Sequence, residues 1–306
     1  MPRGREHHDV LSRTHVSDGP TVRASLDELY HEYNRDDSAS DPVHLVRPFS
    51  NPADREIAGF CAGALAFGRV TSVINSIATL QRLMGPHPAE FVQAFDPAQP
   101  HPELRAMVHR WTRGEDLAAL IWILRQMLEQ SGSIERFLAD GLKDEDDDVG
   151  NALESFSERA MRLDIRRAYG RVPRRPGVCY FFPRPSRGSA CKRLNLFLRW
   201  MVRHDAIDPG GWRAVSPSKL VVPLDTHVIR LGQCLRLTRY TSPGWRMASD
   251  ITSSLRRLDP DDPVRFDFSL CHLGMRNACG FGRRQGDSQC PLKGLCRPRS
   301  RPRARS

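Results

Sequence analysis

Apolar residues recur at intervals of three and four along most of this chain, and that spacing limits the folds open to it. It is typical of helices that bury one face, whereas half-buried strands alternate apolar and polar residues. Alternating runs are rare here, and the segment LVVPL is at most a short extended piece. Helices are expected over about 22–33, 54–67 and 70–84, twice within 102–139, and over 152–169. The sequence therefore predicts an all-α fold.

The expected helix that follows Asp54 is rich in small residues. Asp54 can cap it, because an aspartate side chain accepts hydrogen bonds from the first free amides of a helix. Its small and apolar residues, among them Cys61 and Ala64, would let another helix approach closely. Gly68 is expected to end or bend this helix before the next one begins at Val70.

Composition divides the chain into a core and two tails. Residues 1–22 are polar and are expected to be a disordered tail, whereas 23–296 form one helical domain. The end, 297–306, alternates Arg with Pro and Ser and cannot bury a core. This segment is either an arm that binds along the phosphates of a nucleic acid or a terminus that only increases solubility. Within the domain, the acidic run 143–148 is interpreted as a solvated loop or helix end.

The charge balance favours a polyanionic partner. The chain has 46 Lys and Arg against 36 Asp and Glu, which gives a net charge of +10. Each cation that meets a phosphate releases condensed counterions, so nucleic acid is the expected partner. No apolar run approaches the roughly 18 residues of a membrane span, and the first residues lack a signal peptide's apolar stretch. We therefore expect no membrane partner, a cytoplasmic location and reduced cysteines.

The segment GSACKRLNLFLRWMVRHD, residues 188–205, holds the first candidate for chemistry. Gly188 and Ser189 supply a turn and a cap, and Leu194 begins a run of apolar residues at helical spacing. Lys192 then lies in the first turn of the helix, where the positive end of the helix dipole disfavours a cation. A neutral lysine amine is a nucleophile. The alternative is an exposed lysine that contacts solvent or phosphate.

The segment KLVVPLDTHVIRLGQCLRL, residues 219–237, holds the second candidate. Pro223 breaks an extended apolar run, and Asp225 or Thr226 can cap the helix that follows. The core positions of that helix are expected to be Val228, Leu231 and Leu235. A carboxylate fixed at this point can steer a base or stabilise developing positive charge. The alternative is an aspartate that only caps the helix.

Together these segments resemble a known superfamily. PLDTHVIRL is similar to the VDTHV-R motif of the helix-hairpin-helix DNA glycosylases, which include endonuclease III, adenine glycosylase and 8-oxoguanine glycosylase. A closer resemblance is to an uncharacterised, mainly bacterial family distantly related to these enzymes. Its members share the strings GSACKRLNLFLRWMVR, PLDTHVIRL and FDFSLCHLG. This resemblance covers about residues 25–296 and neither tail.

The resemblance implies two helical subdomains of the helix-hairpin-helix glycosylase type, with the hairpin region at about 177–240. It also implies a DNA N-glycosylase, with or without AP-lyase activity, that removes a damaged or modified base from duplex DNA. Asp225 would be its catalytic aspartate and Lys192 its Schiff-base lysine. The implied DNA-binding residues are Arg187, Gly188, Ser189, Arg193 and His227. A non-catalytic nucleic-acid-binding protein on the same fold is the alternative.

The chain also departs from the well-studied glycosylases. Their LPGVG hairpin is absent, and FPRPSRGSAC stands in its place. An extra loop, HDAIDPGGWRAVSPSK, separates the two candidate residues. The resemblance therefore implies no particular lesion. Arg199 and Arg203 are treated as solvated helix residues, since this is the common place for arginines on a helix.

Four cysteines crowd into residues 271–296 with the pattern C-x7-C-x10-C-x5-C. By resemblance to endonuclease III, Cys279, Cys290 and Cys296 fall on three ligands of a [4Fe–4S] cluster. The family's remaining cysteine, just before Cys290, is missing, and Cys271 is the candidate replacement although it lies in an apolar segment. Thiolates bind zinc equally well. We expect a site for a metal ion or an iron–sulfur cluster, and binding that metal could be the protein's main function. The alternative is a remnant of such a site that no longer binds a metal.

Overall fold

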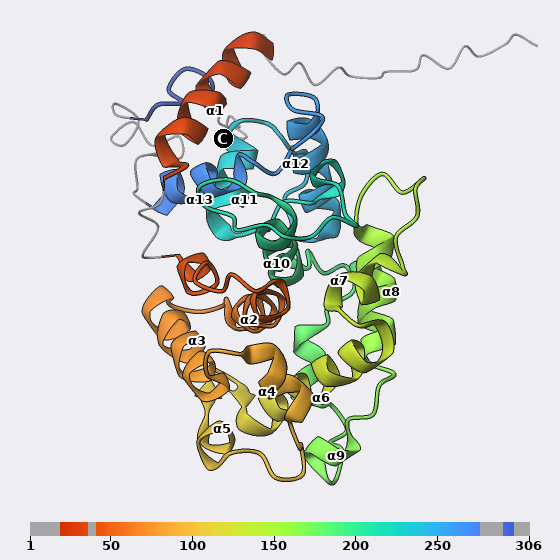
Figure 1. The fold of residues 1–306 in the computed structure, drawn as a ribbon. Helices are drawn as coiled ribbons and strands as arrows, with labels where there is room; N and C mark the ends of the chain where they lie inside the picture. Colours follow the sequence, from red (N-terminus) through yellow and green to blue (C-terminus); the bar gives the residue numbers. More distant parts are fainter. Residues whose placement is uncertain (1–18, 36–40, 276–289, 297–306) are drawn as a thin grey trace, which may run out of the picture.

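The computed structural model describes residues 19–35, 41–275 and 290–296, which form a predominantly helical molecule (Figure 1). This confirms the all-α class. The α-helices are α1 (Gly19–Tyr33), α2 (Pro52–Leu65), α3 (Val70–Met84), α4 (Pro88–Ala94), α5 (Pro102–Ala106), α6 (Gly114–Ser131), α7 (Ile134–Ala139), α8 (Gly150–Ala160), α9 (Arg166–Tyr169), α10 (Lys192–Val202), α11 (Thr226–Cys234), α12 (Trp245–Arg256) and α13 (Asp267–Met275). Short 3₁₀ turns are η1 (Pro42–Leu45), η2 (Gly177–Phe181), η3 (Pro185–Arg187) and η4 (Pro217–Lys219), and the strands are β1 (Val108–His109) and β2 (Thr112–Arg113). Within the described ranges, none of the helices is long and apolar enough to cross a membrane.

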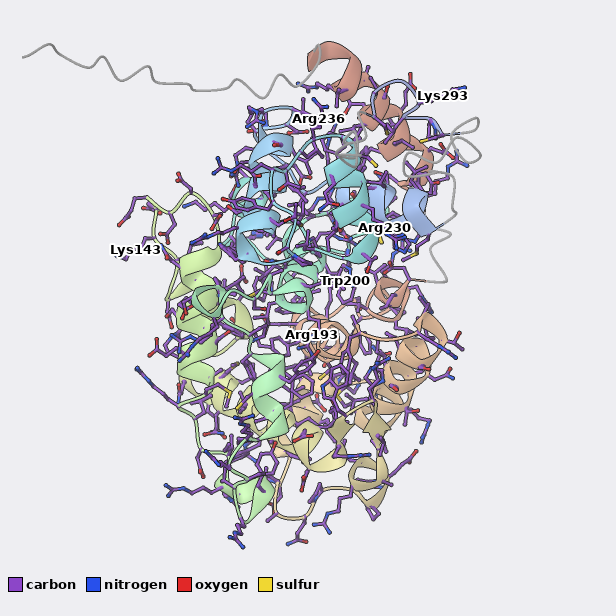
Figure 2. The ribbon with its side chains drawn as sticks, turned by 180° about the vertical axis from the view of Figure 1, so that it is seen from behind. Lys143, Arg193, Trp200, Arg230, Arg236 and Lys293 are labelled. Atoms are coloured by element: carbon purple, nitrogen blue, oxygen red, sulfur yellow. The ribbon has the colours of Figure 1, made fainter. Side chains whose placement is uncertain are left out.

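Helices α2 and α10 pack against each other across the middle of the molecule. Helices α1, α11, α12 and α13 lie on one side of this pair, α3, α4, α5, α6 and α9 lie on the other, and α7 and α8 lie beside it (Figure 1). Arg193 and Trp200 of α10 mark this central position in Figure 2. A Cβ atom at Gly63 would lie 3.2 Å from the Cβ of Phe197 and 3.3 Å from the Arg193 carbonyl. The small residues of α2 therefore allow the close approach that the sequence predicted.

The helix boundaries differ from expectation at several points. Helix α1 begins at Gly19, inside the segment expected to be a disordered tail, and residues 1–18 and 297–306 lie outside the described part. Asn51, not Asp54, caps α2, because its side chain accepts from the first amides of the helix. Asp54 is instead buried and accepts from the Ala89 amide at 2.9 Å. Helix α3 has the predicted bounds.

The segment 102–139 is not two helices. Helix α5 ends at Ala106, and a short antiparallel hairpin of β1 and β2 precedes α6 and α7. A Cβ atom at Gly114 would lie 2.2 Å from the Leu104 carbonyl oxygen, so this glycine lets the chain cross itself at the start of α6. The expected helix 152–169 is also divided, since α8 ends at Ala160 and α9 begins only at Arg166.

Candidate functional site

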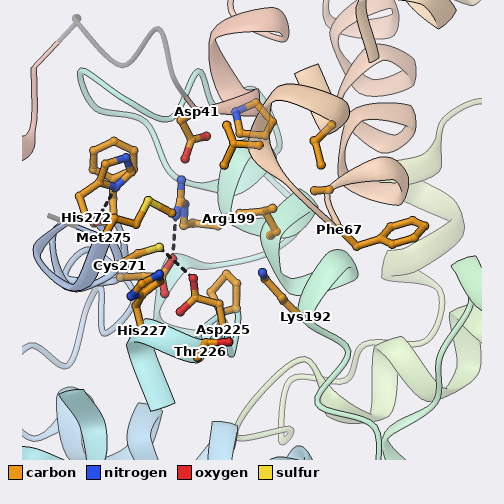
Figure 3. Close-up of a pocket in the computed structure, with 18 of the residues that line it drawn as sticks. Asp41, Phe67, Lys192, Arg199, Asp225, Thr226, His227, Cys271, His272 and Met275 are labelled. Carbon is orange, nitrogen blue, oxygen red and sulfur yellow. Dashed lines mark hydrogen bonds and ion pairs between the residues drawn. The ribbon is translucent and has the colours of Figure 1, made fainter. Parts of the chain in front are cut away.

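Helices α10 and α11 both begin at a cavity of about 290 Å³ (Figure 3). Helix α13, the turn between α2 and α3, the first turn of α3 and the start of η1 supply its other walls. The residues of the cavity that carry charged or reactive groups are Asp41, Lys192, Arg199, Asp225, His227, Asp267, Cys271 and His272. The structure therefore brings together the two residues that the sequence singled out for chemistry.

Asp225 is held at the cavity by both of its carboxylate oxygens. It is the N-cap of α11, and its Oδ1 accepts from the Val228 amide at 2.7 Å. Its Oδ2 accepts from the Cys271 thiol of α13 at 2.9 Å. Burial, together with the Asp225 and Asp267 carboxylates, raises the pKa of the Cys271 thiol, so the thiol keeps the proton that it donates. The predicted cap is thus confirmed, and the carboxylate has a fixed orientation.

Lys192 is the first residue of α10 and points into the cavity toward Asp225 (Figure 3). Among the described residues, its ammonium group has no hydrogen bond or ion pair. The cap of α10 differs from expectation. Cys191 occupies that position with a left-handed φ of 49°, and the Ser189 hydroxyl accepts from its amide at 3.1 Å instead of capping the helix. Such a φ is costly for a residue other than glycine, so packing must hold this turn in place.

The floor of the cavity is a buried network of ion pairs. Arg199 donates to Asp208 at 3.1 Å and to Asp267 at 2.7 Å. Arg203 also pairs with Asp208 and reaches Asp262 at 2.9 Å. Both arginines are buried, so the expectation that they are solvated is wrong. Burial lowers the pKa of each arginine, but the surrounding carboxylates outweigh it and keep both groups charged.

Three polar atoms of the cavity residues are buried and have no hydrogen-bond partner among the described residues. They are Nη2 of Arg199, Oδ1 of Asp267 and Nδ1 of His227. Burial raises the pKa of Asp267 to about 7, because Arg199 only partly offsets it and Asp225 adds a second negative charge. Buried polar groups in native proteins are normally paired. An unpaired donor and an unpaired acceptor are therefore left on residues that line the cavity.

The residues predicted to bind DNA divide into two groups. Arg187 and Gly188 are exposed at the end of η3, where backbone and guanidinium can face a partner. Ser189 is partly buried beside them. Arg193 is buried and donates to the carbonyls of Ala64 and Tyr180, so it supports the fold and does not present its charge on an outer surface. His227 lines the cavity.

The predicted metal ligands are not assembled in the part of the chain that the structure describes. Cys279 lies outside the described residues. Cys271 is hydrogen-bonded to Asp225, Cys290 is buried and Cys296 is partly buried. No group of three metal-ligating side chains occurs within 19–35, 41–275 and 290–296. A cluster or zinc site at this end of the chain stays a prediction.

Several cavity residues were not found by sequence reasoning. Arg199 and Asp267 are charged residues inside apolar helical runs, LNLFLRWMV and FDFSLCHLG, and that pattern is a signal for a buried pair. Phe67 and Asp41 carry no such signal, because they reach the cavity only through the packing of α2 and η1 against α10 and α13.

A family model described as "Protein of unknown function (DUF2400)" matches residues 41–276, which is well over half of the chain. No curated protein matches the sequence. No solved structure matches it either.

Proposed function

The chain belongs to the DUF2400 family, and from the geometry of its cavity we propose that it is a DNA N-glycosylase that removes a damaged or modified base. One observation carries the proposal. Lys192 and Asp225 come from separate segments, each starts or caps a helix, and both face one cavity. Neither neighbourhood alone favours chemistry, but an amine and a fixed carboxylate facing each other are the groups that a glycosylase with lyase activity would use.

Asp225 would act on the positive charge that develops as the base leaves. The glycosidic bond breaks with its electron pair going to the base, which then takes up a proton, and the sugar becomes oxocarbenium-like. A carboxylate that already has its orientation stabilises this cation without reorganising. The hydrogen bonds from Val228 and Cys271 supply that orientation. Asp225 could equally assist an attacking water, which would give an abasic site.

Lys192 would provide the lyase branch of the reaction. After it loses a proton, its amine forms a bond to C1′ of the sugar in place of the base. The bond from C1′ to the ring oxygen then breaks, the oxygen takes one of the two protons on the nitrogen, and a Schiff base that keeps the other proton results. Lys192 is the first residue of α10 and has no hydrogen bond or ion pair among the described residues, so its amine is available to the sugar.

The unpaired atoms of the cavity support recognition of an extruded base. Enzymes that act on a base take it out of the duplex and read its edge with hydrogen bonds. The free Nη2 of Arg199 and Oδ1 of Asp267 offer a donor and an acceptor for such an edge. Phe268 and Met275 add apolar walls. The exposed Arg187 and the overall charge of +10 would serve the duplex backbone.

Base-release screening across a panel of modified duplexes tests the proposal. Asp225→Asn is the matched variant, because asparagine still caps a helix but carries no charge. We expect release of at least one modified base, reduced about a hundredfold or more in Asp225→Asn. Borohydride should trap a covalent adduct in the wild type but not in Lys192→Met.

Two outcomes contradict these assignments. Base release without any trapped adduct would exclude the lyase role of Lys192. Asp225 would then assist the attack of water on the sugar. Salt-sensitive DNA binding that survives Asp225→Asn, with no base released from any duplex, favours the non-catalytic binding protein.

A further inference from the structure

Three aromatic side chains form a cluster on the surface of the protein. Phe67 follows α2, Trp111 is at the tip of the β1–β2 hairpin and Tyr180 belongs to η2; together they are called the aromatic cluster. The ring centroids lie 4.9 Å apart for Phe67 and Trp111, 5.4 Å for Phe67 and Tyr180, and 5.0 Å for Trp111 and Tyr180. Trp111 is 50% exposed and Tyr180 is 41% exposed. Large aromatic surface left in water indicates a binding site.

The aromatic cluster is fixed from below. His109 is buried, and its two ring nitrogens bond to the Phe67 carbonyl and the Ser76 hydroxyl, each at 2.9 Å. The Arg193 guanidinium lies 3.9 Å from the ring centre of Tyr180 and also donates to the Tyr180 carbonyl. These contacts hold the rings before any partner arrives, which lowers the entropy cost of binding.

The surroundings of the aromatic cluster are positively charged. Arg193 is buried beneath the rings, so the charge that a partner can meet directly is that of the exposed Arg110. The guanidinium of Arg110 lies 5.2 Å from the Trp111 ring centre, and Arg110 forms no ion pair within the described part of the chain. Aromatic faces beside an exposed arginine match a nucleotide, which offers a flat base and a phosphate.

The aromatic cluster is continuous with the cavity. Phe67 and its neighbour Gly68 line the cavity wall, and Figure 3 shows Phe67 beyond Lys192, away from His272 and Met275. A DNA strand with the sugar of one nucleotide at Lys192 would therefore pass next to these rings. Since every base has a π-face, such stacking tolerates different sequences.

We propose that Phe67, Trp111 and Tyr180 form a stacking site for an unpaired DNA base adjacent to the nucleotide that enters the cavity. The proposal rests on DNA as the partner in the proposed function, but it does not require base release. A protein that binds DNA without cutting it would use the same rings.

The test compares two undamaged single-stranded oligonucleotides of equal length. One is oligothymidylate, and the other has abasic residues in place of the thymidines, so that both offer the same phosphates. Trp111→Ala and Tyr180→Ala should each weaken oligothymidylate binding by about five- to a hundredfold. Binding of the abasic strand should change little, and Trp111→Phe should retain most of the affinity.

A matched control and a second readout keep the test decisive. Val108→Ala removes exposed apolar surface from the same hairpin, since Val108 is 56% exposed, and it should leave both affinities unchanged. Tryptophan emission should be quenched by oligothymidylate in the wild type, and that part of the quenching should be lost in Trp111→Phe. Circular dichroism checks that each variant is folded.

Other results overturn the stacking site. Equal losses on both strands would show that the variants disturb charge or fold. A wild-type dimer that Trp111→Ala dissociates would show that a second copy covers the rings. If stacking is seen but no duplex releases a base, the glycosylase proposal fails and the stacking site stands.

Discussion

Gly274→Ala tests whether the contact between α11 and α13 maintains the cavity. A Cβ atom at Gly274 would lie 2.6 Å from Cβ and 2.7 Å from Nδ1 of His227. Ordinary carbon contacts are about 3.5–4.0 Å. Because the Cβ of His227 is bonded directly to the backbone, no side-chain rotation relieves the clash, and the helices must separate by about 1 Å. Asp225 and Cys271 are on opposite sides of this contact, so their 2.9 Å hydrogen bond is stretched as well.

The expected change in the free energy of unfolding follows from two opposing effects. Overpacking a core costs about 1–3 kcal/mol. Replacing glycine by alanine inside a helix returns about 0.5–1 kcal/mol. We therefore expect Gly274→Ala to lower the free energy of unfolding by about 1–2 kcal/mol in urea titrations, and to reduce base release through the displaced Asp225.

Gly232→Ala is the matched control. Gly232 lies in α11 and, like Gly274 in α13, is a buried helical glycine. The atom that its Cβ would meet is Cδ1 of Ile251 at 2.8 Å, the end of a flexible side chain that can turn away. The control variant should differ from the wild type by less than about 1 kcal/mol. Equal stabilities for the two variants would refute the argument that contact with a backbone-anchored atom decides the outcome.

Two further predictions concern buried charges. Burial raises the pKa of Glu56 to about 7, so the folded chain holds its proton more tightly than the unfolded chain does. The stability that Glu56 contributes is complete below the ordinary pKa of a glutamate and is lost as the pH rises through about 7. Glu56→Gln should therefore make the free energy of unfolding in urea depend less on pH in this range. The same pH dependence in the variant and the wild type would contradict the assignment. Asp208→Asn removes a buried negative charge that both Arg199 and Arg203 contact, and it should lower the free energy of unfolding by about 3–5 kcal/mol in the same assay. Glu129→Gln, in an exposed pair with Arg125, is the control and should lower it by less than about 1 kcal/mol. Similar losses in the two variants would show that the network beneath the cavity contributes no more than a surface pair.

The sequence predicted the local features and missed the ones that depend on packing. The bounds of α3 and the Asp225 cap follow from periodicity and from side-chain chemistry within a few residues. The β1–β2 hairpin was missed because strands of two residues are too short to show alternation. Cys191 was missed because a left-handed cysteine has no local signature and is set by its surroundings. The pairing of Cys271 with Asp225 joins distant segments and needs the fold.

The loop 204–219, which connects the two candidate residues, supports the cavity from behind. It provides Asp208, which is fully buried and pairs with Arg199. Arg199 in turn holds Asp267, whose second oxygen is left free among the residues of the cavity. Through these ion pairs the loop sets the positions of the Arg199 donor and the Asp267 acceptor, although none of its residues lines the cavity. If the proposed reaction is correct, a loop that fixes these two groups would also fix which base edge they accept, so shortening it should change base preference before it changes the chemistry at Asp225.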